Sequence, residues 1–434
     1  MVVVKFLGGA REVGRSAVLI KSKNGNSCLL DYGVRFKEED RLPIDSELGN
    51  LRAVALSHCH IDHSGALPFL YNEHNIPLLT NALTYEVSEI LIRDIIKISK
   101  HSYPFGYKEL DKLRNNTIFL ENKVRYKIDD NFYITFYNAG HIPGSVSILV
   151  EVDGKRIFYT GDINNQPTNL IEPADPREIP KIDCLITEST YALKDHPNRK
   201  ELEKTFIENV VNTTDNSGNV LIPAFGVARS QEILLLLKKY NFQGKIFLDG
   251  LTKKISATYF EYPNKLKDFN FYKRAFSDSK FVTFKNRKNI KKLSNFVMIS
   301  PSGMLKGGAA LHYIKDILED RHSAIYMVGY QAEETPGNIL LEKGIFEYQD
   351  DRKFHDSNQS IKIKAKCDVD YFDFSSHSDS SQLLDYVSNL NVNRHNNAIF
   401  CIHGDEKATT TFAKNLAKQG FNAVAPETGE SYTL

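Results

Sequence analysis

The sequence lacks any apolar stretch long enough to cross a membrane. Its longest apolar runs, such as Ile233 to Leu237, are far shorter than the ~20 residues that a bilayer requires. Met1 is not followed by the basic and then apolar segment of a secretory signal. These absences argue against a membrane protein and a secreted precursor. We therefore expect a cytosolic protein with no membrane partner.

Cysteine is scarce and tryptophan is absent. The cysteines are odd in number, far apart and mostly inside strand-like runs: Cys28, Cys59, Cys184, Cys367 and Cys401. This pattern is typical of reduced, buried thiols and argues against a disulfide framework. The absence of tryptophan, in a chain with many Asn and Lys, does not identify a source.

The chain also lacks a large net charge, which is only +1, but the charge is unevenly distributed. Between Leu193 and Ser375 there are 29 Lys plus Arg against 23 Asp plus Glu, a net of +6, which leaves 26 against 31 elsewhere. The densest cationic run comprises Lys285, Arg287, Lys288, Lys291 and Lys292, with Lys253 and Lys254 upstream. Such runs are usually solvated faces, although beside an active-site cleft they would attract phosphates.

What the sequence does contain is a histidine cluster, His-Cys-His-Ile-Asp-His, from His58 to His63. It follows a buried-strand pattern and precedes apolar residues, so we expect a loop that leaves a strand and enters a helix. Imidazole and carboxylate groups together suit zinc or a similar divalent ion. One turn cannot aim every donor at one ion, so His58 and His60 should face one metal and Asp62 and His63 another. The alternative is a surface cluster of polar loop residues.

Further candidate ligands stand at the ends of other predicted strands. His141 follows the strand 132–137, Asp162 follows the strand 156–160, and Glu188 follows the strand 184–187. Asp31 ends an N-terminal strand and could orient a ligand histidine. Gly140 and Gly144 would let the backbone approach a metal closely. This repetition predicts a site at one edge of a sheet.

The middle of the chain has a different pattern, in which strands alternate with helices. Examples are the strand 219–223, the helix 229–240 and the strand 245–248, followed by strands at 296–300 and 324–328. At 434 residues the chain exceeds what one core usually serves, and this pattern predicts a separate parallel α/β domain. His377 and His403 then follow in the last part of the chain, the latter after the strand 398–402.

The order His-x-His-x-Asp-His, then His, then Asp, each after a strand, resembles the metallo-β-lactamase superfamily. Glu188, His377 and His403 resemble the further motifs of its β-CASP group. Supporting stretches lie at 8–16, 222–233, 300–304 and 329–332. The likeness covers essentially the whole chain and is greatest to the short archaeal relatives of the nuclease subunit of the cleavage and polyadenylation specificity factor. Because the metal motif begins within the first sixty residues, and some thirty residues follow His403, we expect neither KH domains nor a long C-terminal domain.

The resemblance implies an α/β fold, a metallo-β-lactamase αββα sandwich with an inserted parallel α/β β-CASP domain. The sandwich would comprise residues 1–192 and 376–434, and the β-CASP domain residues 193–375. It also implies two Zn²⁺ ions, which activate water and neutralise charge on a scissile phosphate. The implied ligands are His58, His60 and His141 for one zinc, Asp62, His63 and His403 for the second, and Asp162 between them. His377 would protonate the leaving 3′ oxygen, and Glu188 would orient the His377 ring. Asp31 would orient a metal-binding histidine.

The resemblance further implies a ribonuclease, because DNA-acting members of the group generally carry an aliphatic residue where His403 stands. Single-stranded RNA would be the partner, cut internally, and trimming from its 5′ end stays open as an additional activity. Arg229 and the turn at Ser302 and Gly303 are candidates for phosphate contacts, although a helix-start arginine and an ordinary turn would look the same. A homodimer is in keeping with the family.

Two other functions remain open. A thioester or lactam hydrolase of the same fold would leave the α/β insertion and His377 without a role. A catalytically inactive scaffold subunit would not need a filled ligand position at every motif, as this sequence has.

Overall fold

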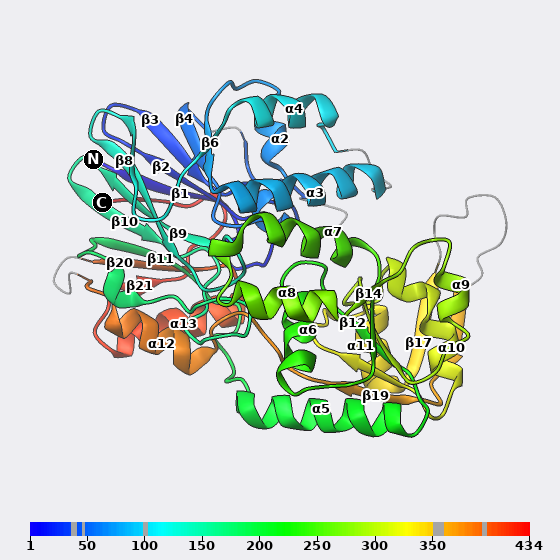
Figure 1. The fold of residues 1–434 in the computed structure, drawn as a ribbon. Coiled ribbons are helices and arrows are strands. Elements are labelled where there is room, and N and C mark those ends of the chain that lie inside the picture. Colours follow the sequence, from blue (N-terminus) through cyan, green and yellow to red (C-terminus); the bar gives the residue numbers. More distant parts are fainter. Residues whose placement is uncertain (36–40, 46–47, 99–102, 350–359, 393–396) are drawn as a thin grey trace. The chain divides into compact units, whose positions relative to one another are not determined.

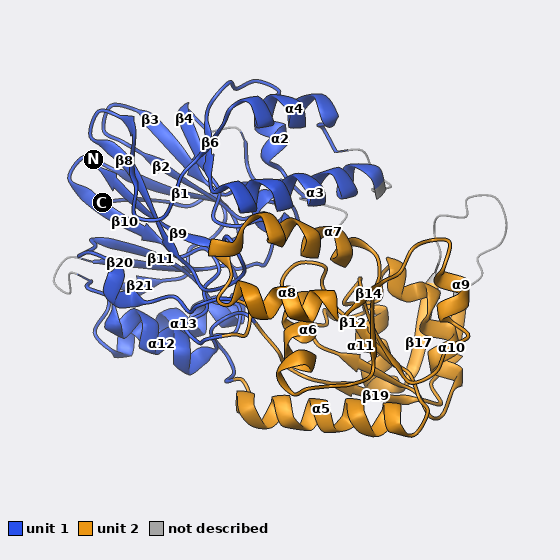
Figure 2. Ribbon diagram, viewed as in Figure 1, with its two compact units in different colours: residues 1–167, 171–195, 376–434 blue, residues 168–170, 196–375 orange. Residues whose placement is uncertain are grey.

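The computed structural model describes residues 1–35, 41–45, 48–98, 103–349, 360–392 and 397–434. The chain forms two compact units (Figure 2). Unit 1 comprises residues 1–167, 171–195 and 376–434, and unit 2 comprises residues 168–170 and 196–375. No helix in the described part of the chain combines the length and the hydropathy needed to span a membrane.

Unit 1 contains two seven-stranded sheets (Figure 1). The first has the order β22 (Ser431–Thr433), β1 (Val3–Gly8), β2 (Ala17–Lys21), β3 (Asn26–Leu30), β4 (Asn50–Ala55), β5 (Leu78–Thr80) and β6 (Thr117–Phe119). The second has the order β21 (Ala423–Val424), β20 (Ala398–Ile402), β11 (Cys184–Glu188), β10 (Lys155–Tyr159), β9 (Val146–Val152), β8 (Phe132–Asn138) and β7 (Arg125–Asp129).

The apolar residues of unit 1 divide into three clusters, which define its layers. One cluster joins the facing sides of the two sheets, with Phe6 and Val18 from the first and Ile148 and Phe400 from the second. The outer face of the first sheet packs beneath α1 (Ile61–Ser64), α2 (Leu67–Leu70), α3 (Ala82–Ile98) and α4 (Tyr107–Asn115). The outer face of the second sheet packs against α12 (Ser380–Asn389), α13 (Glu406–Lys418), and Ala174 and Ile179, which flank the 3₁₀ turn Pro176–Glu178. This arrangement is an αββα sandwich, as predicted.

Strand direction brings the ends of distant segments to one edge of unit 1. In the second sheet β10, β11 and β20 are parallel, and β8 runs the same way because β9 is antiparallel to both β8 and β10. In the first sheet β3 and β4 are parallel neighbours. The carboxyl ends of parallel neighbours meet at one edge of a sheet, which is where α/β proteins usually place their sites.

Unit 2 is built on a six-stranded sheet in which every pairing is parallel. Its order is β14 (Lys280–Phe281), β13 (Lys245–Leu248), β15 (Phe296–Ser300), β12 (Val220–Pro223), β16 (Ala324–Met327) and β19 (Asp368–Tyr371). A hairpin of β17 (Ile345–Gln349) and β18 (Ser360–Lys364) stands apart from this sheet. The helices are α5 (Arg199–Asp215), α6 (Arg229–Lys239), α7 (Leu251–Thr258), α8 (Phe269–Ser277), α9 (Arg287–Ile290), α10 (Ile314–Glu319) and α11 (Pro336–Lys343), with 3₁₀ turns at Tyr259–Glu261, Pro263–Lys265 and Ala309–His312. The predicted parallel α/β class is confirmed.

The loop after β4 enters a helix as expected, and α1 begins at Ile61, inside the histidine motif. Gly140 (φ 68°) lies against the loop that follows β10: a Cβ there would lie 2.1 Å from the Asn164 carbonyl oxygen. A side chain at this position would therefore displace that loop.

All five cysteines are buried and free, which confirms the expectation of reduced thiols. The pKa of the Cys59 thiol is raised because burial disfavours the thiolate. Cys59 therefore contributes packing between the two histidines that flank it.

The interior of unit 2 holds two nearly buried carboxylates, Glu203 and Glu232, that share one guanidinium. Arg199 donates to both of them. Asn169, in the short segment 168–170, donates hydrogen bonds to Glu232 from its backbone N–H and its side-chain amide. The Nζ of Lys239 lies 2.6 Å from Oε2 of Glu203. Such a network stabilises a fold only while each carboxylate keeps its partners.

Arg199→Ala is therefore expected to destabilise unit 2 by about 3 kcal/mol, because it leaves Glu232 buried without a cation. Urea unfolding followed by circular dichroism would measure the change. Lys200→Ala, at the exposed neighbouring position, is the matched control and should cost within about 0.5 kcal/mol. Equal stability of the two variants would contradict the assignment of the network.

Candidate metal centre

Side chains from five strand ends converge at the shared edge of unit 1. They lie after β4 (His58, His60, Asp62 and His63), after β8 (His141), after β10 (Asp162), at the end of β11 (Glu188) and after β20 (His403), with His377 before α12. These residues form three groups of potential metal-binding atoms, and Asp162 belongs to two of them.

The first group contains His58, His60, His141 and Asp162. His60 Nδ1 lies 3.1 Å from His58 Nε2 and 3.2 Å from His141 Nε2. Asp162 Oδ2 lies 3.5 Å from His58 Nε2 and 3.7 Å from His141 Nε2. Four donor atoms therefore surround one point.

The second group contains Asp62, His63 and His403. His63 Nε2 lies 3.5 Å from His403 Nε2, which lies 3.7 Å from Asp62 Oδ2. The other oxygen of Asp162, Oδ1, lies 3.3 Å from His63 Nε2 and 3.4 Å from His403 Nε2. Asp162 thus presents one carboxylate oxygen to each group.

These separations fit the donor spacing of zinc sites. A tetrahedral zinc with bonds of about 2.0–2.1 Å has ligand atoms about 3.3 Å apart. The oxygen Oδ1 of Asp162 is also buried and accepts no hydrogen bond from the described residues. A buried carboxylate oxygen without a donor is costly unless a cation binds it, so the residues fit a metal cluster.

The nitrogens on the far side of the ligand imidazoles have partners that fix the rings. His63 Nδ1 donates to Asp31 Oδ2 at 2.7 Å, and His58 Nδ1 contacts Ser57 Oγ, which itself donates to Asp31. His141 Nδ1 donates to the Ser376 carbonyl, and His403 Nδ1 contacts Ser16 Oγ. Partners of this kind orient metal-binding histidines and hold their tautomer.

Asp31 is fully buried and has a positive φ of 57°. It accepts hydrogen bonds from the backbone and hydroxyl of Ser57, from His63, and from Tyr159 Oη at 2.7 Å. The hydrogen bond from His63 to Asp31 supports the prediction that Asp31 orients a metal ligand. Ser16, Ser57 and Tyr159 were not predicted: Ser57 adjoins the motif, but nothing in the sequence pairs Ser16 or Tyr159 with residues so far away.

Electrostatics keep three of the imidazoles neutral. Burial lowers the pKa of His58 and His141 well below the usual value, and neighbouring histidines lower it further; the pKa of His60 falls to about 4, chiefly through burial. Neutral imidazole is the form that binds metals. Burial also opposes charge on His63, but Asp162 and Asp31 outweigh it and raise the pKa of His63.

The third group joins Glu188 and His377 to Asp162. His377 Nδ1 lies 3.0 and 3.1 Å from the two carboxylate oxygens of Glu188, and its Nε2 lies 3.9 Å from Asp162 Oδ2. Glu188 is held in turn by the backbone N–H groups of Ile163 and Thr190. The ring therefore has one nitrogen on Glu188 and the other toward the cluster.

Burial by itself lowers the pKa of His377, but the carboxylates of Glu188, Asp162 and Asp62 outweigh it and raise that pKa to about 9. His377 is thus protonated at neutral pH. Its side chain keeps 17% exposure, so a reacting group can reach it. This combination suits a proton donor.

The candidate RNA-contact residues all lie in unit 2. Arg229 begins α6 and is nearly buried. Ser302 follows β15, and its backbone N–H and hydroxyl both donate to the Gly307 carbonyl. The Gly303 carbonyl accepts from Gln331. The Ser302 amide is therefore already used within the turn.

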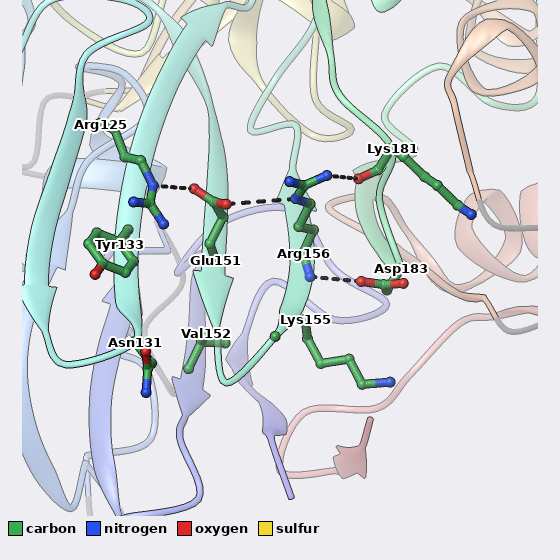
Figure 3. A pocket seen from close by; sticks show the side chains of 10 residues that line it. Arg125, Asn131, Tyr133, Glu151, Val152, Lys155, Arg156, Lys181 and Asp183 are labelled. Carbon is green, nitrogen blue, oxygen red and sulfur yellow. Dashed lines mark hydrogen bonds and ion pairs between the residues drawn. The ribbon is translucent and has the colours of Figure 1, made fainter.

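A separate pocket lies at the opposite ends of the second sheet's strands (Figure 3). It is lined by Arg125, Asn131, Tyr133, Glu151, Val152, Gly154, Lys155, Arg156, Lys181 and Asp183. Glu151 pairs with both Arg125 and Arg156, and Arg125 also stacks on Tyr133. Its charges largely satisfy one another, so we do not assign it a role in the chemistry.

Comparison with protein families gives three matches along the chain. Residues 10–203 match the metallo-beta-lactamase superfamily, residues 230–340 the Beta-Casp domain, and residues 361–426 the Zn-dependent metallo-hydrolase RNA specificity domain. The first and third matches include every residue of the cluster described above. The second lies within unit 2.

Similar proteins come from archaea. "RNase aCSPSF2" of Saccharolobus solfataricus is 34% identical, over 99% of this chain and 85% of that protein. "Probable RNase MJ4" of Methanocaldococcus jannaschii is 33% identical over 99% of both, and "Transcription termination factor FttA" of the same organism is 32% identical over 96% of this chain and 69% of that protein. A crystal structure of a protein of unknown function from Enterococcus faecalis has the same fold, with a TM-score of 0.63 at 14% identity and full coverage of both chains.

Proposed function

This chain belongs to the metallo-β-lactamase superfamily, among the members with Beta-Casp and RNA-specificity domains, and we propose that it is a two-zinc ribonuclease. Its substrate would be single-stranded RNA, and its reaction the hydrolysis of phosphodiester bonds. The observation that carries the proposal is the shared carboxylate of Asp162, with one oxygen toward each group of donors.

His58, His60 and His141 would hold one zinc ion, Asp62, His63 and His403 the second, and Asp162 both. When bound, two zinc ions would supply an activated water and the positive charge that phosphodiester hydrolysis requires. The chain's own residues would set the geometry. Asp31 would fix the His63 ring through Nδ1. The Ser57 hydroxyl, which donates to the same Asp31 carboxylate, would hold the His58 ring through its Nδ1.

His377 would protonate the leaving 3′ oxygen. Its Nε2 points toward Asp162, while Glu188 holds Nδ1 and favours the charged ring. Glu188 accepts hydrogen bonds from the backbone N–H groups of Ile163 and Thr190. The position of His377 is therefore fixed relative to the segment that carries Asp162. Proton donation to a poor leaving group is where general acid catalysis has its largest effect.

The relatives named RNase favour RNA over the other candidate substrates. A thioester or lactam hydrolase would need neither the acid at His377 nor an RNA-specificity domain. An inactive scaffold would not need both groups of donors. In unit 2 we propose Arg229, Ser302 and Gly303 as phosphate contacts, Gly303 through its backbone N–H. The Ser302 hydroxyl would exchange its hydrogen bond to the Gly307 carbonyl for one to a phosphate oxygen.

A direct test is to incubate the purified protein with end-labelled single-stranded RNA and with a thioester substrate. Cleavage of the RNA alone would support the proposal. Comparing RNAs with 5′-triphosphate, monophosphate and hydroxyl ends would separate internal cutting from 5′ to 3′ degradation, because only the latter depends on the end. Intact RNA in the presence of fully loaded protein would refute the nuclease activity.

We expect about two zinc ions per chain by elemental analysis of the purified protein. His403→Ala should leave about one, because it removes a donor from the second group and none from the first. Cys59→Ser, a buried change between His58 and His60 outside all three groups, is the matched control and should retain both. One zinc in the unmodified protein would contradict the two-ion assignment.

A further inference from the structure

A long part of unit 2 carries no acidic residue. Between Asp278 and Asp316 there is no Asp or Glu, whereas the segment contains Lys280, Lys285, Arg287, Lys288, Lys291, Lys292, Lys306 and Lys315. The first part of this segment includes β14, at the edge of the six-stranded sheet, and α9. Figure 2 shows both elements in unit 2.

A tightly bonded turn connects β14 and α9. The backbone N–H of Thr283 donates to Asn286 Oδ1 at 2.7 Å, and the Asn286 N–H donates to Thr283 Oγ1 at 3.3 Å. The Arg287 N–H also donates to the Thr283 carbonyl at 3.1 Å. Reciprocal bonds of this kind fix a turn without any core residue in it.

The turn is anchored on both sides. Val282 is fully buried, and its N–H donates to the Leu248 carbonyl in the neighbouring strand. Arg287 donates to both oxygens of the buried Asp249, and Ile290 is buried in the core. The backbone at the tip of the turn is therefore held in place by its flanks.

Phe284 stands at this tip with 86% of its surface exposed. Its ring has no aromatic partner among the described residues. In contrast, the ring of Phe281, a residue that is 39% exposed, packs on Phe276 with 4.7 Å between the ring centroids. A single exposed phenylalanine is ordinary, but one presented by an anchored turn within a cationic segment calls for a ligand with both an aromatic face and negative charge.

Lysines surround this ring in sequence and are free to bind such a ligand. Lys285, Lys288 and Lys292 are exposed and form no ion pair with the described residues, whereas Lys291 pairs with Asp316. We call Lys280, Phe281, Phe284, Lys285, Lys288 and Lys292 the Phe284 patch.

We propose that the Phe284 patch binds single-stranded RNA, with a base stacked on Phe284 and phosphates on the lysines. Sequence-independent single-strand binding combines an aromatic platform with cations in this way. Every nucleotide of a single strand supplies both a phosphate and an unpaired flat base, whereas an acidic protein supplies flat rings only where it carries aromatic residues, and double-stranded RNA keeps its bases stacked away from a side chain. The proposal rests on the proposed function for the choice of RNA as substrate, and it adds a binding site outside the metal centre.

The absence of tryptophan makes the test specific, because Phe284→Trp introduces the chain's single tryptophan. Titration with a 20-nucleotide oligouridylate should quench its fluorescence in a saturable way that weakens with salt. Phe119→Trp, at a 55% exposed position in unit 1, is the matched control and should not respond. Adding Lys285→Ala and Lys288→Ala to Phe284→Trp should weaken the apparent affinity and reduce its salt dependence.

Unchanged tryptophan fluorescence of the Phe284→Trp variant, at oligouridylate concentrations that saturate the protein in a gel-shift assay, would overturn the proposal. An equal response to a double-stranded RNA, or to vesicles of equal parts phosphatidylcholine and phosphatidylserine, would also overturn it, because charge alone would then account for the signal. Quenching by the single strand alone supports stacking on the patch.

Phe284→Ala should raise KM for a 20-nucleotide substrate about ten-fold and leave kcat unchanged, because a stacking contact that does not involve the reacting atoms binds ground state and transition state equally. A change in kcat with no change in KM would overturn a binding role. Fluorescence quenching without any RNA cleavage would refute the proposed function and leave the patch intact, whereas cleavage without quenching would refute only the patch.

Discussion

Replacing Asp62 and His63 together by alanine is expected to reduce RNA cleavage by about 10⁴-fold or more, equivalent to about 5.5 kcal/mol of transition-state stabilisation. The substitutions leave His403 and one oxygen of Asp162 as the only donors of the second group. The first group keeps all its members. The protein should then bind about one zinc ion, and the positive charge that a second ion would supply would be missing.

Initial rates on labelled single-stranded RNA would measure the loss, alongside zinc content and thermal unfolding. Cys59→Ser is the control within the same motif and should cleave at nearly the unmodified rate. Gel-shift binding of RNA by the double variant should persist, because the proposed contacts in unit 2 are untouched. A double variant that retained more than about one hundredth of the activity would show that the second group is not needed for the reaction.

The double variant would also not be expected to unfold. Asp62 is partly exposed, and His63 is held mainly by Asp31, whose other donors, Ser57 and Tyr159, remain. A cooperative unfolding transition above the assay temperature, alongside the loss of activity, would therefore separate a role in chemistry from a role in folding.

The sequence predicted individual strands because they are short apolar runs that end in turn residues, whereas the sandwich itself was implied by the resemblance to a known superfamily. The helix from Arg229 and the strands at 245–248 and 296–300 are found where the pattern placed them. It could not predict β22, because Ser431–Thr433 is too short to show a pattern and exists through pairing with β1 at the other end of the chain. Long-range pairing of this kind is a tertiary effect.

The candidate site illustrates the same limit. Donors can be proposed from sequence because histidine and aspartate at strand ends are unusual, and their order resembles a known superfamily. Which ring nitrogen faces the cluster cannot be derived from spacing: His60 presents Nδ1, whereas His58 and His141 present Nε2. That choice depends on partners brought in from elsewhere, such as Ser376 on the far nitrogen of His141.

The acid at His377 supplies the second large effect. His377→Ala should lower kcat by about 10²–10⁴-fold, because the leaving 3′ oxygen would depart without a proton. Zinc content should remain that of the unmodified protein, since His377 lies in neither of the two proposed zinc groups. His74→Ala, a histidine outside all three groups, is the matched control and should leave kcat unchanged.

A substrate with a better leaving group distinguishes proton donation from a structural role. RNA with sulfur in place of the bridging 3′ oxygen releases a thiolate, which needs no proton. His377→Ala should cleave this substrate at close to the unmodified rate if His377 is the acid. A loss as great as that on ordinary RNA would refute the assignment.

The pH profile gives an independent test of the pairing with Glu188. A pKa raised to about 9 means that His377 is protonated, and therefore active, below that pH, and that activity declines as pH rises through it. The positive charge of bound zinc would lower this value, so the alkaline limb should lie at or below about pH 9. Glu188→Gln removes the largest interaction that raises the pKa of His377, and leaves burial, which lowers that pKa. The alkaline limb of the activity profile should therefore move to lower pH, while the ligands of the first group stay in place. An alkaline limb that stays at the same pH in Glu188→Gln would show that another group titrates there, and that Glu188 does not set the charge of His377.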